Sequence, residues 1–356
     1  MNKVDESKRM SQRMRTTLLT ALLLGLLAAC NAPPRSHHHT LFVFGTLIEI
    51  TLAGVDRQQA ENLFIELESD FQRWHTQWTP WQDSDLRRSN SALQAGEEIL
   101  LPASIAPLIS RSQALYEKSD GLFNPAIGKL IRLWRFHQFD QPGIHPPPAA
   151  RIAELVKAGP RITDIHIDGQ RAHSSNADVD MNFGAFAKGY AIDLAMRKLR
   201  QRGVHNAVIN AGGDLSVIGA VGERAWRIGI RHPRADTLIA SLDALPGDSV
   251  FTSGDYERYY IYEGKRYHHI LDPRTGYPAQ GISSVTVIDE DAGLADAAAT
   301  ALLVAGVDDW HRIARRMGIR YVMLIDETGR VHMNPKMADR IRFETEPPPI
   351  TLSEPL

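Results

Sequence analysis

The sequence predicts a single α+β domain. Short segments rich in β-branched and aromatic residues are interspersed with segments whose apolar residues recur at helical spacing. No internal repeat, heptad run or second lipophilic stretch divides the 356 residues. The composition, 43% hydrophobic and 23% charged, is that of a globular protein with a sizeable core. Forty basic and 42 acidic residues leave a formal charge of -2, so we expect no nucleic acid among the partners.

The N-terminal segment is typical of a lipoprotein signal peptide. A basic stretch precedes an apolar run at residues 18–29, which is too short to be a confident membrane span. The single cysteine, Cys30, follows Leu-Ala-Ala as in the bacterial lipobox, and a chain with one cysteine can form neither an internal disulfide nor a thiolate metal cluster. We therefore expect a signal peptide at residues 1–29, a lipid on Cys30 that anchors the protein on the periplasmic side of a membrane, and a tether at residues 30–40. A secretory signal with a chance cysteine is the alternative.

The folded domain is expected to open on a strand. Residues 41–53 are rich in β-branched and aromatic side chains, and they predict one long strand with a glycine interruption at Gly45. A long helix should begin near Arg57, because the apolar residues that follow lie at helical spacing. A further helix is predicted with Ser104 as its N-cap and a stop near Gly121.

Shorter elements should follow the loop at residues 141–149, which contains four prolines. Strands are predicted at residues 165–167, 207–210, 226–230, 259–262 and 284–288. Helices are predicted at residues 186–202, 295–304 and 308–317. The domain is expected to end at residue 343, and the proline-rich tail at residues 344–356 to be flexible.

Two glycine-containing turns could approach a ligand closely. Residues 184–190 follow a strand-like segment and open a helix, so free amide groups and Lys188 would suit a phosphate group, although a turn of this kind can be purely structural. The turn is neither a Walker A loop nor a GxGxxG motif. The second turn, Gly212-Gly213, follows a predicted strand and allows either close backbone approach or a simple hairpin.

Asp296 and Thr300 are candidate metal ligands. They lie four residues apart in a helix-forming run, so their oxygen atoms should face the same direction. Hard oxygen donors at this spacing suit Mg²⁺, which completes its coordination with phosphate oxygens and water. The alternative is a helix N-terminal acid followed by a threonine bonded to its own backbone.

His268 and His269 could accept a proton near neutral pH. Adjacent residues of a strand point to opposite faces, so one of the two should reach a given site. The chain contains no GxSxG, HExxH or EF-hand motif, which argues against triad hydrolases and zincins.

Taken in order, these segments resemble one family, the FAD:protein FMN transferases or ApbE family. The matching segments are residues 44–46, 121–125, 184–193, 210–215, 252–258, 268–276 and 295–300. The resemblance implies a single ApbE-like (T-fold-like) domain that cleaves FAD at its pyrophosphate with Mg²⁺. FMN would become esterified to a threonine or serine of a target flavoprotein, such as a subunit of a membrane electron-transfer complex, and AMP would leave.

The resemblance also implies roles for individual residues. The metal ligands would be the backbone carbonyl of Ala185 and the side chains of Asp296 and Thr300, and His269 would be the general base, with His268 in reserve. FAD contacts would come from Phe44, Trp81, Leu122, Phe123, Asn124, Asn182, Lys188, Ile270 and Asp272.

Three positions depart from the family pattern. Asn124 and Asn182 stand where the family usually has aspartate, and Phe44 stands where it has methionine. An asparagine keeps a hydrogen-bonding side chain but lacks the charge. Two other functions therefore remain open: hydrolysis of FAD to FMN and AMP, and non-catalytic flavin binding by an exported lipoprotein.

Overall fold

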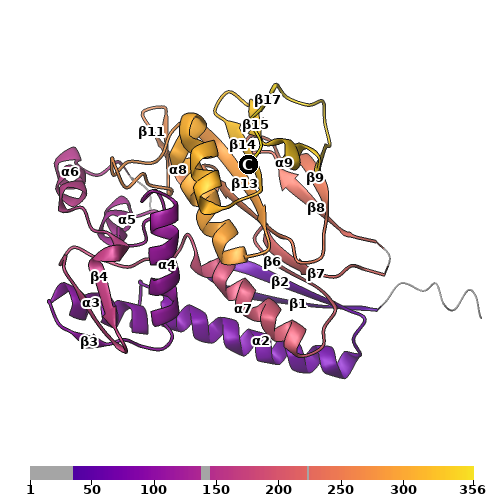
Figure 1. Cartoon of the computed structure of the whole chain (residues 1–356), viewed down its shortest axis with the longest axis horizontal. Coiled ribbons are helices and arrows are strands. Elements are labelled where there is room, and N and C mark those ends of the chain that lie inside the picture. Colours follow the sequence, from indigo (N-terminus) through magenta and orange to yellow (C-terminus); the bar gives the residue numbers. More distant parts are fainter. Residues whose placement is uncertain (1–34, 138–144, 223) are drawn as a thin grey trace, which may run out of the picture.

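A computed structural model describes residues 35–137, 145–222 and 224–356 (Figure 1). In this part of the chain the framework is a nine-stranded sheet with the order β1-β2-β6-β7-β10-β13-β14-β15-β17. Neighbouring strands are antiparallel except β15 and β17, which are parallel. The strands are β1 (Ser36–Val43), β2 (Thr46–Ala53), β6 (Asn206–Ala211), β7 (Asp214–Ile218), β10 (Ser249–Gly254), β13 (Ile282–Asp289), β14 (Tyr321–Asp326), β15 (Val331–Met333) and β17 (Ile350–Leu352).

Three long helices pack on one face of this sheet (Figure 1). They are α2 (Arg57–Trp78), α7 (Ala187–Gln201) and α8 (Ala292–Met317). Helix α2 forms as predicted: Asp56 caps its N-terminus by accepting from the N–H of Gln59 at 2.8 Å, and its apolar stripe is buried in the main core. The opposite face of the sheet packs on a second core formed with β8 (Trp226–Arg231), β9 (Leu238–Ala244), β16 (Ile341–Phe343) and α9 (Pro335–Ala338).

A group of short elements lies beside the helical layer (Figure 1). It comprises α3 (Asp85–Gln94), α4 (Ala106–Lys118), α5 (Gly128–Trp134), α6 (Ala149–Ala158), the 3₁₀ turn η1 (Ile162–Asp164) and the small sheet of β3 (Ile99–Leu100), β4 (Ile165–Asp168) and β5 (Arg171–Ser174). A separate hairpin consists of β11 (Tyr259–Tyr262) and β12 (Lys265–His268).

The predicted start of the domain was wrong in two respects. Residues 36–40, predicted as tether, belong to β1 and pair with β2. Residues 41–53 form two strands of a hairpin because the chain reverses at Phe44 and Gly45, which have φ angles of 55° and 75°. Alternating apolar residues cannot distinguish a hairpin from one long strand, since side chains alternate between faces in both.

Other boundaries also differ from the predictions. Helix α4 begins after Ile105, and Ser104 donates instead to Asp85 at 2.7 Å. The helices predicted at residues 295–304 and 308–317 are two parts of α8, which is kinked at Gly306. The tail is not entirely flexible, because β17 pairs with β15.

The predicted signal peptide and the lipid-bearing Cys30 lie outside the described residues, as do residues 138–144 of the predicted loop. Both N-terminal assignments therefore stay predictions. Among the residues that are described, no helix has the length and apolar character needed to span a bilayer.

Candidate active site

Helix α7 crosses the beginning of α8 at Gly189. A Cβ atom on Gly189 would overlap the carbonyl group of Ala292 and lie 2.8 Å from Cβ of Asp296, so this crossing requires glycine. The N–H of Gly189 donates to Asp296 Oδ2 at 2.9 Å. This hydrogen bond fixes a carboxylate that is only 6% exposed beside the N-terminus of α7, where the helix dipole favours negative charge.

Two further carboxylates hold α8 in place. Asp193 on α7 accepts from the N–H groups of Ala292 and Gly293, each at 3.0 Å. Asp291 caps α8 and forms an ion pair with Arg111 on α4. Burial and the charge of Asp291 raise the pKa of Asp193 to about 7. The first turns of α8 are therefore anchored to both α7 and α4.

Lys188 joins α7 to the sheet. Its ammonium group forms an ion pair with Asp214 at the start of β7, and the other carboxylate oxygen of Asp214 accepts from the N–H of Thr252 at 2.7 Å. Burial lowers the pKa of Lys188, and the nearby carboxylate of Asp296 partly opposes this effect. Lys188 thus lies among carboxylates from two different elements, although it is close in sequence to neither.

Gly212 brings the hairpin of β1 and β2 to the same place. Its φ is 67°, and a side chain on it would collide with Thr46 Oγ1. The turn that contains Phe44 therefore packs directly against the turn that leads to Asp214. Of the two interpretations of this glycine pair, close backbone approach is the one that these contacts support.

The two histidines have different environments. The Nδ1 atom of His269 is buried and has no hydrogen-bond partner within the described ranges. Burial, followed by the positive charges of Arg258 and Lys188, lowers the pKa of His269 well below its usual range, so its imidazole is neutral at pH 7. His268 Nε2 lies 2.7 Å from the carbonyl oxygen of Ala279. One ring nitrogen of His269 therefore has no partner among the described residues, whereas His268 is engaged in the fold.

Thr300 lies one helical turn after Asp296 on α8, and its hydroxyl is 3.2 Å from Ser253 Oγ on β10. We refer to Lys188, Asp214, Asp296, Thr300 and His269 as the polar centre. Across the described ranges, no three His, Cys, Asp or Glu side chains gather around one point. A cation at the polar centre would thus need backbone and hydroxyl oxygens in addition to a carboxylate.

The carbonyl of Ala185 is suited to such a role. The first hydrogen bond of α7 runs from Tyr190 N–H to the carbonyl of Phe186, so the carbonyl of Ala185 lies just outside the helical ladder. The N–H of Gly189, which would donate to Ala185 in a continuous helix, donates to Asp296 instead. Ala185 is therefore four residues before Gly189, whose N–H binds the predicted metal ligand Asp296.

Phe44 and Trp81 each stack on another aromatic ring just beyond the ends of β1 and α2. Phe44 is half-buried and stacks on Trp78 with ring centroids 6.2 Å apart. Trp81 is 39% exposed and stacks on His137 at 3.9 Å, and the guanidinium of Arg132 lies 5.8 Å from its centroid. Positive φ at Phe44 is a sparsely populated conformation for a bulky residue, a feature common at ligand sites.

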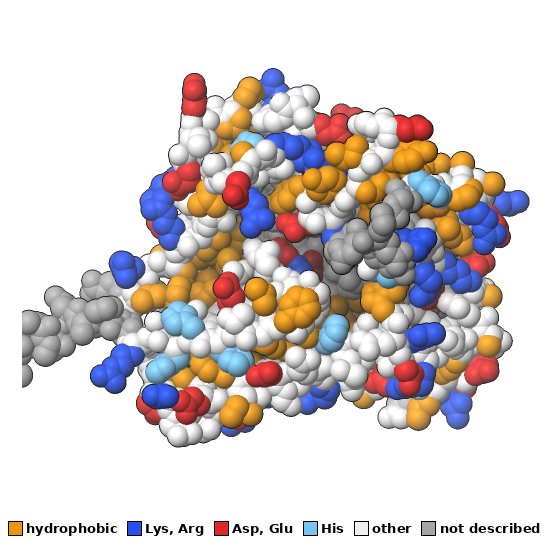
Figure 2. All heavy atoms as spheres, turned by 180° about the vertical axis from the view of Figure 1, so that it is seen from behind, with side chains coloured by type: hydrophobic (Ala, Val, Ile, Leu, Met, Phe, Trp, Pro, Cys, Tyr) orange, Lys and Arg blue, Asp and Glu red, His pale blue; other side chains and the backbone are white. Residues whose placement is uncertain are grey.

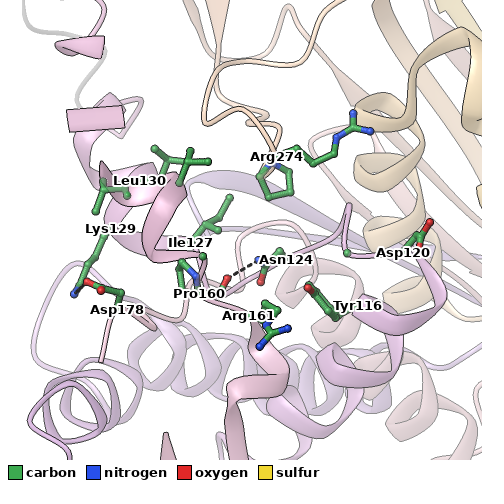
Figure 3. A pocket seen from close by; sticks show the side chains of 15 residues that line it. Tyr116, Asp120, Asn124, Ile127, Lys129, Leu130, Pro160, Arg161, Asp178 and Arg274 are labelled. Carbon is green, nitrogen blue, oxygen red and sulfur yellow. Dashed lines mark hydrogen bonds and ion pairs between the residues drawn. The ribbon is translucent and has the colours of Figure 1, made fainter. Parts of the chain in front are cut away.

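Asn124 lines a different cavity, of about 230 Å³, between α4, α5, α6 and the turn at Arg274 (Figure 3). Its amide nitrogen donates to the carbonyl of Pro160 at 2.9 Å, and its oxygen accepts from the N–H of Ala126 at 3.1 Å. An aspartate at this position would repel the Pro160 carbonyl. The asparagine at position 124 therefore matches its local contacts.

The remaining predicted FAD contacts are mostly engaged within the protein. Leu122, Phe123 and Ile270 have buried side chains. Asn182 Oδ1 accepts from the N–H of Gly184 at 2.9 Å. Asp272 forms an ion pair with Arg274 at 2.8 Å and also accepts from its backbone N–H. Direct contact of these residues with a ligand stays a prediction.

Asp214 and Arg258 were not among the predicted site residues. Both lie in segments that resemble the family, since Asp214 follows the glycine pair and Arg258 ends the segment at residues 252–258. No sequence signal pairs either residue with Lys188 or His269, because the partners come from distant elements. Seen from behind the view of Figure 1, the molecule has a hollow near its middle, with acidic, basic and apolar side chains around it (Figure 2).

One family model matches most of the domain. The model of the ApbE family matches residues 44–323. The chain belongs to the ApbE family. That range contains every residue of the polar centre, and the match confirms the family resemblance inferred from the sequence.

Relatives of known name extend the comparison. The chain is 38% identical over 355 residues to an FAD:protein FMN transferase of Rhodobacter capsulatus, with 98% of this chain and 67% of that protein covered. It is 30% identical over 331 residues to an FAD:protein FMN transferase of Klebsiella pneumoniae (strain 342), with 88% of this chain and 94% of that protein covered.

Two solved ApbE structures share the fold. The ApbE protein of Thermotoga maritima has a TM-score of 0.78 at 31% identity and covers 88% of this chain and 100% of its own. The flavinyl transferase ApbE of Pseudomonas stutzeri, in its apo form, has a TM-score of 0.72 at 30% identity and covers 83% of this chain and 93% of its own. The predicted α+β, ApbE-like fold is thereby confirmed.

Proposed function

We propose that this protein transfers FMN from FAD to a threonine or serine hydroxyl of a target flavoprotein and releases AMP. Membership of the ApbE family and the name FAD:protein FMN transferase of its relatives support the reaction class. The observation that carries the proposal is the polar centre, where Lys188 and two carboxylates lie near His269, whose Nδ1 has no hydrogen-bond partner in the described part of the chain.

The polar centre fits a diphosphate. Lys188 supplies positive charge to phosphate oxygens, and the N-terminus of α7 adds the positive end of the helix dipole. The carbonyl of Ala185, the carboxylate of Asp296 and the hydroxyl of Thr300 are the oxygen ligands that would hold Mg²⁺. When bound, the cation neutralises charge on the phosphates and makes phosphorus easier to attack. A donor set made only of oxygen atoms is the kind that a hard cation prefers.

His269 is the group that removes the acceptor proton. The acceptor hydroxyl oxygen forms a bond to the phosphorus of the FMN half, and the bond from that phosphorus to the bridging oxygen breaks. AMP leaves with the bridging oxygen, and the hydroxyl proton passes to the neutral imidazole of His269. Because the pKa of His269 is lowered, its imidazole is deprotonated before the reaction and can take up this proton.

Trp81 and Phe44 would contact the flat rings of FAD. They lie just beyond the ends of α2 and β1, where Trp81 is 39% exposed and Phe44 is half-buried. The predicted lipid on Cys30 would hold the enzyme on the periplasmic side of a bacterial membrane. This location would suit acceptors that are flavin subunits of membrane electron-transfer complexes.

The experiment is a labelling assay. The purified chain, FAD, Mg²⁺ and a flavoprotein subunit bearing an acceptor threonine should yield a fluorescent protein band that survives denaturation, together with one AMP per flavin attached. Removing Mg²⁺ with EDTA should abolish the band. AMP release without labelling would show an FAD hydrolase instead, and FAD binding with neither product would show a carrier.

A further inference from the structure

The hairpin of β11 and β12 is attached directly to the polar centre. Its base is closed by the N–H of His269, which donates to the carbonyl of Arg258 at 3.1 Å. Its tip is a two-residue turn at Glu263 and Gly264, with φ angles of 48° and 75°. In Figure 1 the hairpin stands at the edge of the molecule near α8, so it joins the proposed general base to the surface.

The two faces of this hairpin differ. Tyr260 and Tyr267 are cross-strand partners and stack at 5.5 Å, and both pack on the small core around Trp134. On the other face, Tyr259 is 40% exposed and Ile261 is 63% exposed. The first face holds the hairpin on the domain. The second face exposes Ile261 and the ring of Tyr259, over which the guanidinium of Arg266 lies 4.0 Å from the ring centroid.

The backbone of β11 is also open on one side. Arg258 pairs with His269 by a backbone hydrogen bond, and the two-residue turn pairs Tyr262 with Lys265 in the same way. Tyr259 and Ile261 alternate with these positions, so their N–H and C=O groups point away from β12. Among the described strands, only β12 pairs with β11.

We propose that the outer side of β11, at Tyr259 and Ile261, docks the acceptor protein. The occupant is an extended segment next to the modified threonine, with apolar side chains on one face, added along β11 by backbone hydrogen bonds. We choose this occupant because β11 leads directly to the proposed general base. Ile261 is paired with Arg266, and Arg266 is three residues from His269, a separation of about 10 Å along the strand. This inference rests on the proposed function, since it presumes that a protein hydroxyl is the acceptor.

The test compares Ile261→Asp with Ile65→Asp. Ile65 is a matched control because it is 68% exposed on α2, away from the hairpin. The probe is a flavoprotein subunit that the wild-type chain labels, and KM and kcat for this subunit are measured at saturating FAD and Mg²⁺. Ile261→Asp should raise the KM for the subunit about tenfold or more, with kcat and FAD affinity unchanged. Ile261→Leu should keep the KM within about twofold of the wild-type value. Ile65→Asp should change neither KM nor kcat.

Each other result has a distinct meaning. An unchanged KM in Ile261→Asp overturns the docking surface and leaves the transferase standing. A lower kcat or weaker FAD binding in Ile261→Asp overturns it as well, because the hairpin would then support the polar centre itself. A wild-type dimer in light scattering that Ile261→Asp converts to monomer assigns the surface to a second copy. Failure of the wild-type chain to label any acceptor is a failure of the proposed function.

Discussion

The polar centre and the cavity at Asn124 are both rich in charged residues, yet the charges are arranged differently. Lys129, Arg161 and Arg274 line the cavity (Figure 3), and each of them forms an ion pair with an acidic residue. These pairs are Lys129–Asp178 at 2.7 Å, Arg161–Asp164 at 3.1 Å and Arg274–Asp272 at 2.8 Å. At the polar centre, Lys188 lies among carboxylates from β7 and α8, and His269 Nδ1 has no partner among the described residues.

The difference lies in whether the charged groups are already satisfied by partners within the fold. Paired charges at the rim of a cavity are already satisfied and contribute modestly to stability. Buried groups held close together by separate elements cost free energy unless a ligand completes them, so their presence indicates a site. Four substitutions test this distinction.

The largest effect is expected from Asp296→Asn. The amide can still accept from Gly189, so the crossing of α7 and α8 should persist, but the charge that would hold a divalent cation is lost. We expect labelling of the acceptor to fall by about a thousandfold or more, since a bound cation contributes several kcal/mol. Asp178→Asn is the control, because it removes one paired carboxylate at the cavity and should leave the rate unchanged. Equal losses in both variants would remove the distinction between the two regions.

His269→Gln should lower kcat by about a hundredfold, the usual contribution of a general base. The pH dependence gives a second measurement. Because the pKa of His269 is lowered, its neutral form prevails down to well below pH 6.5, so kcat/KM for FAD should stay level between pH 8 and pH 6.5 and decline only in more acidic buffer. A decline centred at or above pH 6.5 that disappears in His269→Gln would contradict the burial of this imidazole.

Trp81→Ala should weaken FAD binding about tenfold, because loss of one aromatic stacking partner costs on the order of 1 kcal/mol. Quenching of flavin fluorescence on titration with protein measures the affinity. His137→Ala is the informative companion, since His137 stacks on the same ring at 3.9 Å. If Trp81→Ala leaves the affinity for FAD intact, the ring cluster belongs to the fold and not to the ligand site.

Asn124→Ala should have the smallest effect on activity. Its side chain joins the loop before α5 to Pro160, so its loss should lower the free energy of unfolding by about 1 to 2 kcal/mol while kcat and FAD affinity stay within about threefold. Chemical denaturation and the labelling assay measure the two quantities. The opposite outcome, weaker FAD binding at unchanged stability, would place the cavity of Figure 3 within the cofactor site.

Local sequence patterns predicted the elements that have strong local signals. An apolar stripe at helical spacing from Arg57 onward identified α2, and the order of the motifs along the chain was enough to indicate the family. The hairpin of β1 and β2 and the pairing of β17 with β15 were missed, because strand pairing depends on partners that no local pattern names.

The sequence alone determined which residue types the site contains: a lysine after a glycine turn, an acid and a hydroxyl one turn apart, and a histidine pair. The tertiary structure decided which of them meet. Asp214 reaches Lys188 only because two glycines and an antiparallel sheet place β7 beside α7. His268 is engaged with the carbonyl of Ala279, whereas Nδ1 of the buried His269 has no partner among the described residues. Burial, which sets the pKa values of these groups, is a property of the whole packed chain and cannot be obtained from residue spacing.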